Sequence, residues 1–111
     1  MENAPRENLD AVCRAAFSHY GTELQLDMAQ EECGELIAAI NHFRRKGTEA
    51  LYDVRSEIAD VKIMVRQLEL HFGVTDVDKI VQNKLRRVKE HIRNDRKDVG
   101  QQTKIIGQDR I

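Results

Sequence analysis

Two short runs of acidic residues are the part of the sequence best suited to chemistry. The first run holds Glu31, Glu32 and Glu35, and the second holds Glu57 and Asp60, with 21 residues between Glu35 and Glu57. Each run places two acids three residues apart, so a helix would present both on one side. Clustered carboxylates without His or Cys form an oxygen-donor site, which suits Mg²⁺ or Mn²⁺ and suits zinc poorly. These residues therefore predict a divalent metal site.

The composition predicts that an all-α fold positions these acids. Of 111 residues, 33% are charged, 5% are aromatic and one is Pro, which favours helices over a β-sandwich or barrel. The length fits a single domain over residues 1–111. Between the glycines, apolar residues recur at steps of three and four. This pattern predicts four helices, over residues 6–20, 24–45, 48–71 and 76–93, capped by Thr48 at the third and by Thr75 or Asp76 at the fourth, and then a polar tail over residues 94–111.

The acids interrupt the apolar stripes of the second and third predicted helices. At about 100° per residue, Glu32 falls inside the apolar stripe of its helix and Glu35 falls at its edge. In the next helix, Glu57 falls in the middle of the stripe and Asp60 at its edge. Burying several like charges costs several kcal/mol per ion unless a positive charge compensates. We therefore expect a cation at the acids, although any one of them alone would be read as a surface residue.

The fourth predicted helix supplies basic side chains of two kinds. Lys84 lies at the flank of the apolar stripe, with Arg87 on the same side and Asn83 nearby. A metal held by carboxylates and faced by Lys and Arg is what a polyphosphate ester needs. A second basic group points the other way and contains Arg86, Lys89, Arg93, Arg96 and Lys97. We interpret that group as a solvated face rather than a nucleic-acid groove, because no aromatic residue interleaves it.

Charge and cysteine usage indicate the broad class of protein. The net charge of −1 gives no basic excess of the kind that a dedicated nucleic-acid binder carries. Cys13 and Cys33 are far apart in the sequence, so we expect free, small core residues in a reducing compartment. No apolar run approaches the roughly 20 residues that span a bilayer. We expect a soluble, cytoplasmic protein whose four histidines are surface or capping residues rather than ligands.

The two acidic motifs are part of a longer resemblance. Glu31–Glu35 followed by Glu57–Asp60 matches the EExxE and ExxD motifs of the MazG-like all-α nucleoside triphosphate pyrophosphohydrolases. The similarity extends to the segments 17–21, 25–26 and 83–87, and so covers roughly residues 8–93. The order, spacing and core-facing phase of the acids, with the basic residues that follow, make this resemblance fairly specific.

The resemblance implies an activity and a set of site residues. Members of the family hydrolyse (d)NTPs between the α- and β-phosphates to (d)NMP and pyrophosphate with Mg²⁺, for which Mn²⁺ is an expected substitute. The residues expected to coordinate the metal are Glu32, Glu35, Glu57 and Asp60, which with the neighbouring acid Glu31 form the catalytic set. Lys84 and Arg87 are expected to contact phosphates. Asn83 and Gln25 complete the expected substrate-binding residues.

The sequence leaves the preferred nucleotide base and the number of subunits undetermined. The chain has no Trp, and Met64 stands where some relatives place an aromatic residue, so base selection by stacking is in doubt. A second apolar strip, formed by Tyr52, Ala59, Ile63 and Leu70, predicts a homo-oligomer. The resemblance implies a dimer or tetramer of four-helix protomers. Two alternatives remain: a catalytically silent nucleotide-sensing protein, and a helical interaction module that uses the basic face of its fourth helix.

Overall fold

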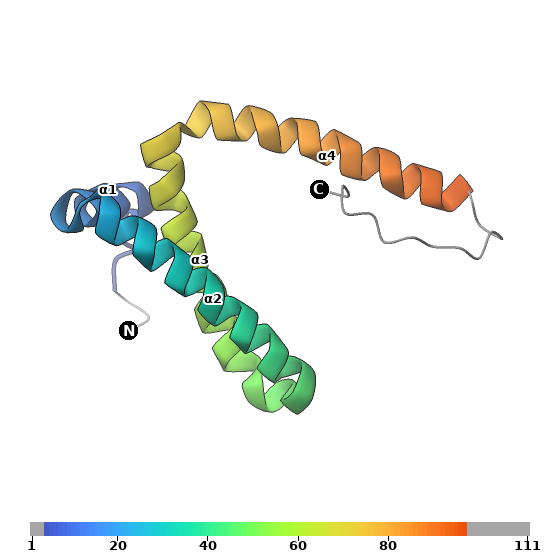
Figure 1. The fold of residues 1–111 in the computed structure, drawn as a ribbon, viewed down its shortest axis with the longest axis horizontal. Coiled ribbons are helices and arrows are strands. Elements are labelled where there is room, and N and C mark those ends of the chain that lie inside the picture. The colour runs from blue at the N-terminus through green and yellow to red at the C-terminus, as the bar shows by residue number, and fades with distance from the viewer. Residues whose placement is uncertain (1–3, 98–111) are drawn as a thin grey trace. The chain divides into compact units, whose positions relative to one another are not determined.

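The structure is a computed structural model that describes residues 4–97, and these residues contain helices and no strand. The elements are α1 (Leu9–Tyr20), α2 (Thr22–Lys46), the 3₁₀ turn η1 (Gly47–Ala50), α3 (Leu51–Phe72) and α4 (Val74–Lys97) (Figure 1). The all-α prediction is thereby confirmed. The chain divides into two compact units, residues 1–72 with α1 to α3 and residues 73–111 with α4. The expectation of a single domain stays a prediction.

Glycines separate the helices, as the sequence predicts. Gly21, Gly47 and Gly73 have φ values of 87°, 66° and 123°, a region that residues with a Cβ rarely adopt. The N–H of Gly21 donates to the carbonyl of Phe17, and the N–H of Gly47 donates to that of Phe43, so each closes a helix end. These backbone positions set where α1, α2 and α3 end.

Three helix ends, at the start of α3 and at both ends of α4, differ from the sequence expectation. Thr48 makes no capping bond, because it lies inside η1, which follows the break at Gly47 and runs into α3 through Leu51 in helical conformation. α4 begins at Val74, ahead of both predicted caps, Thr75 and Asp76. α4 also continues to Lys97, into the predicted tail, because an exposed helix end needs no apolar periodicity to keep its backbone hydrogen bonds. The rest of that tail, residues 98–111, lies outside the described residues.

α2 and α3 lie side by side as an antiparallel pair (Figure 1). Gln25 near the start of α2 bonds to Gln67 near the end of α3, and His42 near the end of α2 faces Asp53 near the start of α3. The buried apolar residues of the described chain are Cys13, Ala29, Ala39, Ala50 and Met64. Two of these five, Ala29 and Ala39, are small residues of α2, so its backbone can approach the neighbouring helix closely.

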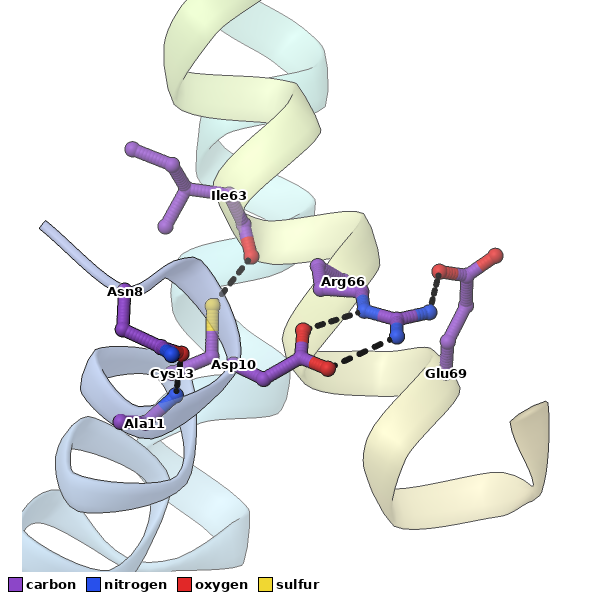
Figure 2. A network of polar contacts seen from close by, with 7 residues as sticks. All are labelled: Asn8, Asp10, Ala11, Cys13, Ile63, Arg66 and Glu69. Atoms are coloured by element: carbon purple, nitrogen blue, oxygen red, sulfur yellow. Dashed lines mark hydrogen bonds and ion pairs between the residues drawn. The ribbon is translucent and has the colours of Figure 1, made fainter. Parts of the chain in front are cut away.

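α1 is fastened to α3 by an ion pair and a thiol contact. The Arg66 guanidinium donates to both carboxylate oxygens of Asp10, at 2.7 and 3.0 Å, and to Glu69 at 3.1 Å (Figure 2). The Cys13 Sγ lies 3.6 Å from the carbonyl oxygen of Ile63, one helical turn before Arg66. This network orients α1 across α3 and leaves the α2 side of α3 for the acids.

Only part of the apolar stripe predicted for α2 is covered. Cys13 is buried as expected, but Cys33 is exposed, which corrects the prediction that both cysteines are core residues. Ile37 is 63% exposed. Cys33 and Ile37 both belong to the apolar stripe predicted for α2. They lie on the part of it that α3 does not cover, since one neighbouring helix covers only a narrow strip of another. Among the described residues, no helix has the length and apolar character needed to cross a bilayer.

Replacing Asp10 with Asn should lower the free energy of unfolding at neutral pH and flatten its loss in acid. Hydrogen bonding to Arg66 holds the pKa of Asp10 below its ordinary value of 3.8. A carboxylate with a lowered pKa stabilises the fold above its unfolded pKa, and that stabilisation is lost as the pH falls through the folded value. Urea unfolding at neutral pH and at about pH 3 measures both effects.

The matched control is Glu90→Gln on α4. Glu90 pairs with Arg93 at 3.3 Å, but both side chains are more than half exposed, at 57% and 54%. Such a pair contributes little to stability, so the control should unfold like the unmodified chain. Equal losses in the two variants would contradict the fastening role given to Asp10.

Candidate metal centre

Three of the predicted metal ligands converge between α2 and α3. One carboxylate oxygen from each of Glu32, Glu35 and Glu57 lies within 4.8 Å of the other two. Glu32 and Glu57 are half-buried, whereas Glu35 is exposed. The antiparallel packing of the two helices, rather than proximity in sequence, brings Glu57 to the pair on α2. The phase of the acids in the apolar stripes agrees with this order of burial.

Two buried carboxylate oxygens at this centre lack a donor from any other side chain. Apart from the contact between the two carboxyl groups themselves, the Oε2 atoms of Glu32 and Glu57 have no hydrogen-bond partner among the residues described. A buried carboxylate oxygen without a donor is costly, and native structures normally satisfy it with a donor, a proton or a metal ion. The two atoms therefore point to a positively charged species at this place.

The acids perturb one another strongly. Burial, followed by the charges of Glu35 and Asp60, raises the pKa of Glu32 from 4.5 to about 7. Burial, again with Glu35 and Asp60, also raises the pKa of Glu57, although its hydrogen bond with the Glu32 carboxyl acts in the opposite direction. Without a cation, the raised pKa favours a protonated Glu32 well above the pH at which a free carboxyl ionises.

The donor set fits a hard divalent cation. Carboxylate oxygens from two helices, without His or Cys in the convergent group, are the ligands that Mg²⁺ and Mn²⁺ prefer. Asp60 is not among the three convergent acids, but its charge acts on both Glu32 and Glu57, so it lies at the margin of the centre. Glu31 is exposed on α2 and contributes the smallest of the charge effects on Glu32.

A pocket of about 360 Å³ opens beside the acids. Its lining consists of Glu35, Ala38, Ala39, His42, Asp53 and Glu57. The His42 Nδ1 lies 3.8 Å from the Asp53 Oδ2 across the pocket. From the sequence, His42 is expected on the surface and Asp53 is assigned no role in the site. The helical repeat could have located both, since His42 lies seven residues after Glu35 and Asp53 four residues before Glu57.

The remaining predicted site residues lie in two places. Gln25 is buried, 5% exposed, and its side-chain amide donates to Gln67 at 2.7 Å. Asn83, Lys84 and Arg87 lie on α4, where Asn83 accepts a hydrogen bond from Arg86 at 2.8 Å. Lys84 is half-buried, and both Asn83 and Arg87 are exposed.

Comparison with known proteins does not identify the class of protein, so the function is inferred from the site itself. No family model matches the chain, and searches of curated proteins and of solved structures return no match.

In EDTA, the free energy of unfolding should fall as the pH rises from about 4.5 to about 7, the two pKa values of Glu32 when unfolded and folded. In that window the native state binds more protons than the unfolded chain, which gives stability a negative slope. Glu32→Gln should reduce this slope and leave only the part that comes from the raised pKa of Glu57. The slope is measured by chemical unfolding across the window, with the exposed Glu23→Gln on the same helix as control.

Glu57→Gln should separate a ligand site from a structural salt-bridge cluster. Because the substitution relieves repulsion, the metal-free variant should be at least as stable as the unmodified chain. Mg²⁺ should raise the melting temperature of the unmodified chain and not that of the variant. A large loss of stability in metal-free Glu57→Gln would instead support a structural role.

Proposed function

We propose that the chain is a Mg²⁺-dependent nucleoside triphosphate pyrophosphohydrolase that cleaves a (d)NTP between the α- and β-phosphates. The convergence of Glu32, Glu35 and Glu57, with two orphaned buried oxygens, is the observation that carries this proposal. The motif resemblance supplies the reaction, and the carboxylate cluster supplies a place for the cation that the reaction needs.

Each acid has a distinct part in the proposed mechanism. Glu32, Glu35 and Glu57 would bind the cation from α2 and α3, and Asp60 adds negative charge at the margin as the fourth expected ligand. When bound, Mg²⁺ neutralises these acids and polarises the phosphate oxygens. Glu35 is exposed and lines the adjoining pocket, so its carboxylate is open to solvent and able to orient a water molecule. Glu31 is the neighbouring acid, to which the resemblance gives the role of binding a second ion or positioning water.

The cationic part of the proposal rests on α4. Lys84 and Arg87 are assigned to phosphate contacts and Asn83 to the substrate, because their motif positions carry those roles in the family resembled. Guanidinium and ammonium groups donate charge-assisted hydrogen bonds to phosphate oxygens and stabilise charge on departing pyrophosphate. No protein nucleophile is needed, since water attacks phosphorus.

Purified protein with Mg²⁺ should convert at least one common NTP or dNTP to its monophosphate and pyrophosphate. EDTA should abolish the reaction. Glu32→Gln, Glu35→Gln, Glu57→Gln and Asp60→Asn should each lose most of the activity, about a hundredfold or more, since each removes charge that binds the cation. Product identity is read by anion-exchange chromatography, with the exposed Glu49→Gln as control.

The product pair decides between this reaction and its rivals. Release of orthophosphate and a diphosphate would contradict the proposal, and so would full activity in any two of the four variants. Nucleotide binding without any product would identify a nucleotide-sensing protein instead.

We further propose a homo-oligomer that buries the strip on α3. Tyr52 is 77% exposed and Ile63 is 43% exposed, so this end of the strip is uncovered. α1 covers the other end, where Leu70 lines a pocket with Cys13 and Phe17. Large apolar side chains left exposed on one helix face favour burial against a second copy.

Ile63→Glu should dissociate the proposed oligomer. The new carboxylate would lie in the buried interface, where desolvation opposes its charge. Sedimentation equilibrium at micromolar concentration measures the mass, and circular dichroism checks that the variant stays helical. Lys62→Glu is the control, because it introduces the same group at an exposed neighbouring position. A monomeric mass for the unmodified chain would refute the oligomer.

A further inference from the structure

Gln25 and Gln67 form a buried amide pair between α2 and α3. They are 5% and 4% exposed, and they are the two buried polar residues of the described chain. The Gln25 Nε2 donates to the Gln67 Oε1 at 2.7 Å. Apolar residues of similar size would pack at least as well at these two positions, so a buried polar pair there suggests a role in binding rather than in packing.

The pair leaves hydrogen-bonding capacity unused. Within residues 4–97, the Gln25 side chain bonds to Gln67 alone, so its Oε1 and the second N–H of its amide are open. The Gln67 Nε2 makes a long contact of 3.7 Å with the Met64 sulfur, which is a weak acceptor. A carboxamide presents a donor and an acceptor side by side, so these open positions suit a ligand with a complementary edge.

A pocket of about 390 Å³ adjoins the pair. Its lining consists of Ala16, Tyr20, Leu24, Gln25, Met28 and Gln67. Apolar walls with a few inward polar groups are typical of sites for small organic ligands. The Tyr20 ring and the Met28 thioether are suited to pack on the faces of a flat ring.

The pocket and the metal centre lie along the same faces of α2 and α3. Met28 lies one turn before Glu32 on α2, and Gln25 lies seven residues before it, a rise of about 10 Å. On α3, Gln67 lies seven residues after Asp60. That separation is comparable to the distance between a nucleobase edge and the phosphates of the same nucleotide.

We propose that this pocket is a nucleobase subsite in which the Gln25–Gln67 pair reads the edge of the base. The proposal rests on the proposed function and adds where the base binds. A base in the pocket places its phosphates toward the acids. Since the amides offer hydrogen bonds rather than an indole ring, the subsite recognises the base edge without a Trp.

The test uses nucleoside monophosphates in EDTA, so it requires neither metal nor turnover. In ¹⁵N-labelled full-length protein, at least one of the four common nucleoside monophosphates at millimolar concentration should shift the side-chain amide signals of Gln25 and Gln67. The exposed Gln30 amide should stay unchanged, and ribose 5-phosphate should shift neither buried amide. No shift with any monophosphate, or equal shifts with ribose 5-phosphate, overturns the subsite.

A double variant, Gln25→Met with Gln67→Met, removes both amides while keeping similar volume and leaving no unpaired buried group. It should stay folded and bind the preferred monophosphate at least about tenfold more weakly, the direction expected when a hydrogen-bonding site loses its partners. Gln30→Met is the matched control. Unchanged affinity in the folded double variant overturns the proposal. Because binding is the readout, the result is distinct from a failure to detect hydrolysis.

Discussion

Carboxylates brought together between two helices repel one another, and the packing of α2 on α3 must overcome that repulsion. The cost is visible in the raised pKa of Glu32, about 7, and in the buried, unpaired oxygens of Glu32 and Glu57. The remaining interface supplies the compensation. Alanines allow close helix approach, and the Arg66–Asp10 pair fastens α1 to α3. The repulsion between the acids is thus offset by packing and by an ion pair elsewhere in the same unit.

The facing sides of α2 and α3 carry three polar features in a fixed order. The Gln25–Gln67 amide pair lies at one end, the acids lie in the middle, and His42 with Asp53 lies at the other end. Antiparallel helices keep this order because each step along α2 is matched by a step back along α3. A ligand that binds along these faces would meet amides, carboxylates and an imidazole in succession, a sequence of groups suited to a nucleotide and its metal.

Much of the fold follows from local chemistry that the sequence displays. Glycine at positions 21, 47 and 73 allows positive φ values and ends the helices there. The apolar periodicity located the helices, and the phase of Glu32 and Glu57 within it indicated that these acids face the interior. Helix ends without a glycine were less predictable: α4 continues to Lys97 because backbone hydrogen bonding continues through polar residues.

The sequence by itself determined which residues form helices and which acids share a helix face, since both depend on the repeat of about 3.6 residues per turn. The tertiary structure alone decided which residues meet across helices. Pairing of Gln25 with Gln67, the approach of His42 to Asp53 and the exposure of Cys33 all depend on the strip of α2 that α3 covers. The position of that strip depends on how the side chains of α2 and α3 interlock. The periodicity of one helix carries no information about which helix packs against it.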